Sequence, residues 1–436
     1  MTTEVDELRA AGVTMLELSF VDNAGITRVK TVPLDRVEDA VAHGVGVSPC
    51  FEAFGSDDVM VAGEYLGGPD GDLRLVPDLT RAVALSAMPG WAWAPANKLT
   101  KTLEPFVACQ RAFADRQVAA AARQGLTLLM AFEHEWIVGS AAAAGFEPAF
   151  DGPAYGQIRL EQVAGYAAAL VADLSRQGLA VQQFHPEYAT GQLELSVAPR
   201  DPVAAADDAV LVRHTVRSRS LAHGWRATFA PTVDPAGAGS GGHLHLSVHD
   251  ADGNTLADLR PPGSAFLAGV LRELPALVAI GAGHPASFLR LQPSRWAGVW
   301  QCWGHETRET ALRMIAGTEE SANAELKCFD ATANPYLLVG CVIAAGLAGV
   351  ADELRLPDPV AGDPALLADD ARDAAGVHRL PTTAAAAADA LASSAVLAAA
   401  LGPEQHDAIV TVRRAEAKRC AELDTAALAD AVRRRW

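Results

Sequence analysis

The chain has 436 residues, of which 50% are hydrophobic and 20% charged, with 35 Lys+Arg against 53 Asp+Glu. This composition is too apolar for a disordered chain and predicts either two domains or one large domain. The formal net charge of -18 argues against a nucleic-acid partner, because phosphate binding needs a basic surface. It is compatible with an enzyme that handles cations, either metal ions or amines.

Cysteine usage and hydropathy indicate a cytoplasmic protein. The six cysteines are scattered and include no CxxC pair, which is typical of reduced thiols. The N-terminus is acidic and lacks the features of an export signal. The apolar stretch 336–350 is shorter than the roughly 18–20 residues that cross a bilayer. We therefore expect no membrane partner.

The first hundred residues predict mostly strands. Segments 15–22 and 27–32 flank Asn23-Ala24-Gly25, a turn signal typical of a hairpin. A further strand is expected at 72–76. Near residue 100 the pattern changes to a helix at 102–124, which Gly125 closes. We place a domain boundary there, giving domains 1–100 and 101–436.

Beyond this boundary, strands and helices alternate to the end of the chain. No sequence repeat is visible, which argues against a solenoid or a propeller. The predicted strands are 126–138, 181–188, 192–197, 226–231, 243–249 and 312–314. The predicted helices are 161–177, 203–223, 265–281, 335–351, 383–401 and 405–423.

Carboxylates lie on a strand whose neighbours are apolar. Glu133 and Glu135 are two residues apart within 128–138, so their side chains share one face of the strand. Two like charges on one face repel unless a cation lies between them. A solvated strand face is the alternative, but the flanking residues are too hydrophobic for an outer strand.

The same pattern recurs further along the chain. Glu187 and Glu194 stand on either side of a glycine-containing turn, and a hairpin would bring them to one end of a sheet. His243 and His245 follow a glycine-rich loop and share a strand face, although a single histidine is more often an ordinary core or surface residue. Glu325 ends another strand-like run. This oxygen-rich set favours Mg2+ or Mn2+ over zinc.

Arginines near these carboxylates indicate phosphoryl transfer. Two hard cations with nearby guanidinium groups suit transfer from a nucleotide, and no Walker A motif is present. A charged surface segment is the alternative, but it fits poorly with the three tryptophans in the same stretch. The arginines of this stretch are Arg290, Arg295, Arg308 and Arg313.

These motifs resemble the glutamine synthetase family over nearly the whole chain. The most specific are Glu133-His134-Glu135, the run 187–194, the run 239–245 and the run 325–336. The resemblance implies an α+β fold, with a small β-grasp domain and a large catalytic domain whose curved antiparallel sheet is flanked by helices. It also implies ATP as cofactor, with two to three Mg2+ or Mn2+ ions per site. In this chemistry, ATP phosphorylates the γ-carboxylate of glutamate and an amine then attacks the acyl phosphate.

The resemblance also implies roles for individual residues. The first metal ion would bind Glu135, Glu187 and Glu194, and the second would bind Glu133, His243 and Glu325. His245, Ser247 and Arg313 would lie by the nucleotide. The substrate side would comprise Arg290, Gly239, Gln192, Lys327 and Trp296, with Arg290 holding the glutamate carboxylate. Arg308 and Arg313 would offset charge on the transferring phosphoryl group.

The chain departs from the family at the amine site. Ammonia-using members have a flap glutamate where this chain has Trp296, and an aspartate that aligns with Ser48, although Glu52 is nearby. Tryptophan can hold an ammonium group by cation–π attraction and pack against an alkyl chain. We therefore expect a primary organic amine as nucleophile. Ala238 replaces an asparagine and Lys327 an arginine on the glutamate side, and lysine keeps the charge but loses the planar fork.

Two alternatives stay open at this point. The favoured interpretation is an ATP-dependent ligase that forms a γ-glutamyl amide from glutamate and an organic amine. The alternatives to it are a glutamine synthetase with an altered ammonium site and a non-catalytic relative with a regulatory or structural role, although all six metal-ligand positions are filled. The resemblance further implies a ring-shaped homo-oligomer of the double-hexamer type with sites between subunits. The loop 44–58 has few obvious partners within its own chain, which agrees with a subunit contact.

Overall fold

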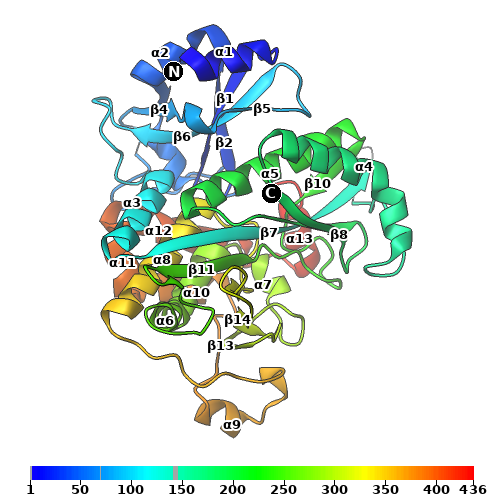
Figure 1. The fold of residues 1–436 in the computed structure, drawn as a ribbon, viewed down its shortest axis with the longest axis vertical. Coiled ribbons are helices and arrows are strands. Elements are labelled where there is room, and N and C mark those ends of the chain that lie inside the picture. Colours follow the sequence, from blue (N-terminus) through cyan, green and yellow to red (C-terminus); the bar gives the residue numbers. More distant parts are fainter. Residues whose placement is uncertain (1, 69, 141–145) are drawn as a thin grey trace.

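The computed structural model describes residues 2–68, 70–140 and 146–436. Figure 1 shows a small N-terminal part (blue) above a larger part crossed by a long sheet. The first sheet has six strands and the second has ten.

A mixed sheet forms the N-terminal part, in the order β2-β1-β6-β4-β3 with β5 beside β6. β1 and β6 run parallel, and β1 and β2 form the predicted hairpin. Leu16, Leu18 and Leu75 are fully buried in its core. These features confirm the predicted β-grasp domain. Its elements are α1 (Thr2–Ala10), β1 (Met15–Val21), β2 (Thr27–Pro33), η1 (Leu34–Arg36), α2 (Val37–His43), β3 (Val45–Val47), η2 (Pro49–Ala53), β4 (Leu73–Pro77), η3 (Leu79–Arg81), β5 (Val83–Ala84) and β6 (Trp91–Leu99).

The large sheet follows the order β16-β13-β14-β15-β11-β7-β9-β8, with β10 beside β7 and β12 beside β11. Its strand pairs are antiparallel, as predicted, except that β13 and β14 run parallel. The strands are β7 (Thr127–Ser140), β8 (Val181–Pro186), β9 (Gln192–Val197), β10 (Trp225–Thr228), β11 (Leu244–Asp250), β12 (Gly253–Asn254), β13 (Trp300–His305), β14 (Thr310–Ile315), β15 (Asn323–Leu326) and β16 (His378–Arg379).

Helices cover this sheet, and two of them approach each other closely. α6 and α8 meet at Gly269 and Gly349, where a Cβ on Gly269 would lie 2.7 Å from the Gly349 Cα. Asn334 caps α8, and its Nδ2 also donates to the carbonyls of Val21 and Asp22. The helices are α3 (Gln110–Arg123), α4 (Gln157–Arg176), α5 (Pro202–Ala222), α6 (Gly263–Gly281), α7 (Ser287–Arg290), α8 (Pro335–Ala351), η4 (Pro364–Leu366), α9 (Asp369–Ala374), α10 (Ala384–Ser393), α11 (Ala395–Leu401), α12 (Pro403–Cys420) and α13 (Thr425–Val432).

Two predicted helices differ most from the structure, and the others agree to within about four residues at each end. The helix expected at 102–124 starts only at Gln110, because Leu103 has a φ of 64° and Pro105 bridges back to Leu99. The helix expected at 383–401 is broken by Ser394 into α10 and α11, which meet at 77°. Ser394 has an extended backbone, and its side chain caps α11.

The expectation that loop 44–58 has few partners within its own chain is wrong. Asp57 pairs with Arg419 of α12 at 2.7 Å, and the Ser56 amide donates to Glu416 of the same helix at 2.8 Å. Asp58 pairs with both Arg28 and Arg435. The end of this loop is therefore anchored on α12 and on the C-terminal segment that follows α13, and it gives no support to a subunit contact.

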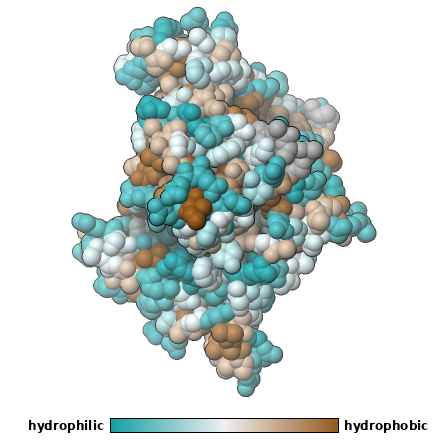
Figure 2. All heavy atoms as spheres, turned by 90° about the vertical axis from the view of Figure 1, so that its right-hand side faces the viewer, coloured by the Kyte–Doolittle hydropathy of each residue, from teal (hydrophilic) through white to brown (hydrophobic). Residues whose placement is uncertain are grey.

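α6 has the length and composition of a membrane-crossing helix, as does the bent pair of α10 and α11 taken together. However, 78% of the apolar window of α6 is buried inside the protein, as in the core helix of a globular fold. On the face drawn in Figure 2, apolar residues form small separate groups among hydrophilic ones.

Candidate metal and substrate site

The pairing of neighbouring strands gathers the acidic residues predicted from the sequence. Glu135 of β7 lies directly opposite Glu194 of β9, and His245 of β11 lies opposite Glu325 of β15. Residues two apart on one strand point the same way, so Glu133 joins Glu135 on this face. β11 lies between β7 and β15, which places imidazoles between carboxylates.

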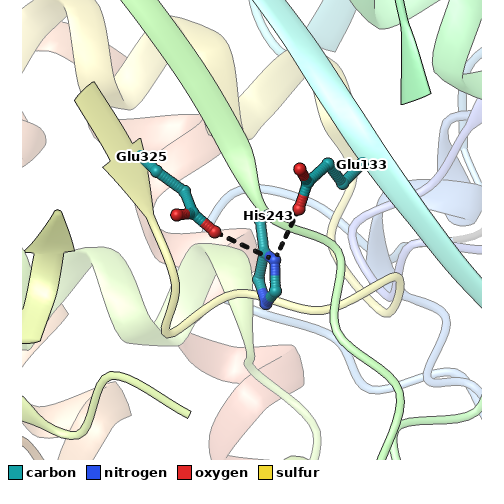
Figure 3. A group of neighbouring side chains, drawn as sticks. All are labelled: Glu133, His243 and Glu325. Atoms are coloured by element: carbon teal, nitrogen blue, oxygen red, sulfur yellow. Dashed lines mark hydrogen bonds and ion pairs between the residues drawn. The ribbon is translucent and has the colours of Figure 1, made fainter. Parts of the chain in front are cut away.

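The first group is the Glu133–His243–Glu325 cluster, drawn in Figure 3. The Nδ1 atom of His243 lies 2.9 Å from Glu133 Oε2 and 3.2 Å from Glu325 Oε1. One donor atom from each residue falls within 4.8 Å of the others, a spacing that a single cation can bridge. The structure thus brings together the three residues expected to bind the second metal ion.

The second group comprises His185, Glu187 and Glu194, whose donor atoms also lie within 4.8 Å of one another. His185 of β8 was not among the predicted ligands, although it stands two residues before Glu187, which directly follows this strand; the same spacing singled out Glu133 and Glu135. Glu135 lies between the two groups: its Oε2 accepts from Gln192 at 2.8 Å, and its Oε1 is 3.8 Å from His243 Nε2.

The crowding of these carboxylates shows that the site fits divalent cations. Burial, together with the negative charges of Glu133, Glu135 and Glu187, raises the pKa of Glu194 to about 10. At neutral pH this carboxyl is an anion only if a positive charge enters the site. The donors are mostly carboxylate oxygens with few imidazoles, which is the set that Mg2+ and Mn2+ accept.

His245 contacts Glu133 at the edge of the site. Its Nε2 lies 3.2 Å from Glu133 Oε1, and its Nδ1 is 2.9 Å from Asn323 Oδ1. Burial alone would lower the pKa of His245, but the hydrogen bond and the charge of Glu133 raise it overall. Ser247, two residues further along β11, is hydrogen-bonded to His249 at 2.9 Å. Both residues stay predicted nucleotide neighbours.

Basic side chains converge on Glu325, which is 1% exposed. Lys327 Nζ donates to its Oε1 at 2.9 Å, and Arg313 Nη1 donates to its Oε2 at 3.1 Å. Burial would raise the pKa of Glu325, but the hydrogen bond from His243 and the charge of Lys327 keep it well below the usual range. Glu325 is therefore an anion that holds cationic groups in place.

Arg290 lies beside this network with one end free. Its Nη2 donates to the Lys327 carbonyl at 3.0 Å and lies 3.2 Å from His243 Nε2, whereas its buried Nη1 has no partner among the described atoms. Gly239 is pressed against Arg290, because a Cβ on Gly239 would lie 2.7 Å from the Arg290 Cγ. Gln192 Nε2 donates to the Gly239 carbonyl at 3.1 Å. Ala238 lines a neighbouring cavity of about 580 Å³.

Two predicted residues lie apart from the clusters. Arg308 is exposed between β13 and β14 and has no hydrogen bond or ion pair within the described ranges. Trp296 is 55% exposed, and its backbone N–H donates to Glu309 Oε1 at 2.8 Å. Glu309 was missed because its burial depends on how the loop folds over it.

Glu52, one of the two residues considered for the second amine-side carboxylate, is fully buried. It pairs with Lys98, and its Oε2 accepts from Gln110 at 2.5 Å. This carboxylate is satisfied inside its own chain. Ser48 caps the short helix η2 through its side chain.

Family models match both parts of the chain. The glutamine synthetase N-terminal domain matches residues 2–104, and the glutamine synthetase catalytic domain matches residues 107–427. The chain belongs to the glutamine synthetase family. This result confirms the resemblance and the α+β fold class expected from it. Ligases of this family use ATP and divalent metals, which agrees with the acidic clusters.

Several proteins of the glutamine synthetase family are similar to this chain over most of its length. Gamma-glutamylpolyamine synthetase GlnA3 of Streptomyces coelicolor is 49% identical, covering 98% of this chain and 94% of that protein. Glutamate--isopropylamine ligase of a Pseudomonas species is 26% identical, covering 86% and 88%. A solved structure of a GmaS/ADP complex superimposes with a TM-score of 0.84 at 25% identity, covering 97% and 98%.

Proposed function

We propose that this protein is an ATP-dependent ligase that joins the γ-carboxyl group of glutamate to an organic primary amine through a γ-glutamyl phosphate. The observation that carries the proposal is the exposed Trp296. The resemblance to the family aligns this position with a carboxylate of the ammonia-using members. An indole accommodates a carbon-bearing amine better than a bare ammonium ion. The names of two relatives, a polyamine synthetase and an isopropylamine ligase, support the same class of nucleophile.

The two clusters would bind two metal ions with different roles in the reaction. Divalent cations, when bound, would neutralise charge on the phosphates and the γ-carboxylate. Glu133, His243 and Glu325 would hold one ion on the nucleotide side, and Glu135, Glu187 and Glu194 would hold the other on the glutamate side. We propose Mg2+ or Mn2+ as these ions because the donors are mostly oxygens.

Arginines and a lysine orient the substrates around these ions. Arg290 would bind the glutamate carboxylate through its free Nη1 atom, in line with the fork geometry of guanidinium. Lys327, Gln192 and Gly239 would line the same side, and His245, Ser247 and Arg313 would lie by the nucleotide. Arg313 already points at Glu325 and would stabilise the transferring phosphoryl group. Arg308 would have to swing in from the surface to share this role.

An amine panel tests the proposed function. Phosphate release is measured with ATP, Mg2+ and glutamate in the presence of ammonium, isopropylamine, ethanolamine, putrescine or spermidine. We expect an organic amine to give at least about tenfold higher kcat/KM than ammonium, which corresponds to about 1.4 kcal/mol. Faster turnover with ammonium would instead identify a glutamine synthetase with an altered ammonium site. Failure to bind ATP in the presence of Mg2+ would indicate a non-catalytic relative.

We also propose a cytoplasmic, ring-shaped homo-oligomer with active sites between subunits. The support is the family, whose N-terminal and catalytic domain models match separate parts of the chain, and the predicted division of the chain at residue 100. Mass photometry of the purified protein should show a species of ten or more chains, roughly the double-hexamer size. A monomer at micromolar concentration would contradict the ring.

A further inference from the structure

A buried carboxylate lies beside Trp296 without a cationic partner. Glu309, just before β14, is only 6% exposed. Its Oε1 accepts the backbone N–H of Trp296 at 2.8 Å, while its Oε2 is buried and has no partner among the described atoms. A buried carboxylate without a positive counterpart is costly, because desolvation is not repaid by attraction.

The charged groups around Glu309 do not neutralise its negative charge. Burial and the negative charge of Asp363 raise the pKa of Glu309. The backbone hydrogen bonds from Trp296 and Ser294 and the positive charge of Lys327 lower it, and the net change is a rise. Lys327 is already paired with Glu325, the proposed metal ligand. No Lys, Arg or His forms an ion pair with Glu309 within the described part of the chain. The charges around Glu309 therefore favour the binding of a positively charged group at its carboxylate.

The loop that covers Glu309 lies next to the catalytic clusters. A Cβ on Gly298 would lie 2.8 Å from the Lys327 Cβ, so the loop touches the segment that follows Glu325. Ser294 and Trp296 both have a φ of 55°, a left-handed conformation that costs a non-glycine residue on the order of 1–3 kcal/mol. Contacts hold the strained loop: Ser294 Oγ donates to Asp363 Oδ2 at 2.6 Å, and Arg295 donates to the Gly237 carbonyl at 3.2 Å.

We propose that Glu309 binds the ammonium group of the amine substrate and accepts its proton, once the 294–298 loop shifts to admit the amine beneath the Trp296 indole. This inference rests on the proposed ligase function and supplies the amine-side carboxylate that position 296 lacks. One ammonium proton passes to Glu309, and the freed nitrogen lone pair attacks the carbonyl carbon of the acyl phosphate. The new C–N bond forms as the C–O bond to phosphate breaks, phosphate leaves with that electron pair, and a second nitrogen proton goes to solvent.

The variant Glu309→Gln tests this role, because glutamine keeps an oxygen that can accept the Trp296 N–H but removes the charge. With spermidine or isopropylamine as substrate, we expect kcat/KM for the amine to fall about 10–100-fold, the range for a lost hydrogen bond to a charged group. Hydroxylamine is mostly uncharged at neutral pH and traps the acyl phosphate, so hydroxamate formation should stay within about twofold of wild type. The KM values for ATP and glutamate should not change.

Further measurements separate binding of the amine from a purely structural role. The melting temperature of Glu309→Gln should equal or exceed that of wild type, because an unpaired buried charge has been removed. Asp352→Asn is the matched control: it removes one exposed carboxylate that pairs with Arg272 and should leave amine kcat/KM unchanged.

Two results would overturn the inference: unchanged amine kcat/KM in Glu309→Gln, or an equal loss of hydroxamate formation. Wild-type protein that forms no amide with any amine would contradict the proposed function itself and this inference with it.

Discussion

Replacing Glu325 with glutamine is expected to lower kcat by roughly 10²–10³-fold, the loss seen when one preorganised electrostatic group is removed from an active site. The side chain keeps its size, but the anion shared by His243, Lys327 and Arg313 disappears. The affinity for a divalent cation should fall as well, because a neutral amide is a poorer ligand for hard cations. Phosphate release and a calorimetric Mn2+ titration measure the two effects.

Glu320→Gln is the control for the Glu325 variant. It removes the same charge from the exposed turn before the same strand, so kcat and Mn2+ affinity should stay at wild-type values. Wild-type kcat in Glu325→Gln would show that this residue holds neither a metal ion nor the basic side chains needed for turnover. The melting temperature of Glu325→Gln is measured before its kinetics, because Lys327 would be left buried without its anion.

Replacing Gly25 with alanine is expected to destabilise the protein by about 2–4 kcal/mol. Gly25 lies in the β1–β2 turn with a φ of 81°, and a Cβ there would overlap the Thr332 carbonyl oxygen of the catalytic part. Left-handed strain contributes about 1 kcal/mol and overpacking about 1–3 kcal/mol. The midpoint of urea-induced unfolding measures the change.

Gly12→Ala separates strain from overlap. Gly12 has nearly the same φ, 80°, but apart from its chain neighbours no described atom lies within 4 Å of the position that a Cβ would take there. This variant should lose only about 1 kcal/mol. Equal losses in the two variants would mean that the contact between the hairpin turn and Thr332 does not matter for stability.

Much of the site was predictable because buried carboxylates are rare on apolar strands. Glu133 and Glu135 stand out within the run 128–138, and the strand register then places them beside Glu194 and His243. The spacing of two along a strand could have added His185, which precedes Glu187 by the same interval. The sequence pattern therefore predicts those candidate ligands that lie on strands.

Features that depend on tertiary contacts were not predictable in this way. Glu309 looks like an ordinary surface residue in the sequence, and only the folded chain shows that it is buried with the Trp296 N–H against its Oε1. The C-terminal partners of Asp57 and Asp58, Arg419 and Arg435, lie 362 and 377 residues away in the chain, so no local pattern reveals them. The break at Ser394 arises from its extended backbone and its bond to Glu273, within a segment whose alanines favour a helix.

Asn334 couples the unfolding of the small domain to the fraying of helix α8 in the large domain. The same side chain accepts from the first turn of α8 and donates to the carbonyls of Val21 and Asp22. Detaching the small domain therefore loosens the cap of a largely buried helix in the large one, and fraying that helix releases the small domain. The consequence is cooperativity: we expect the two domains to share one unfolding transition, with a calorimetric enthalpy that belongs to the whole chain.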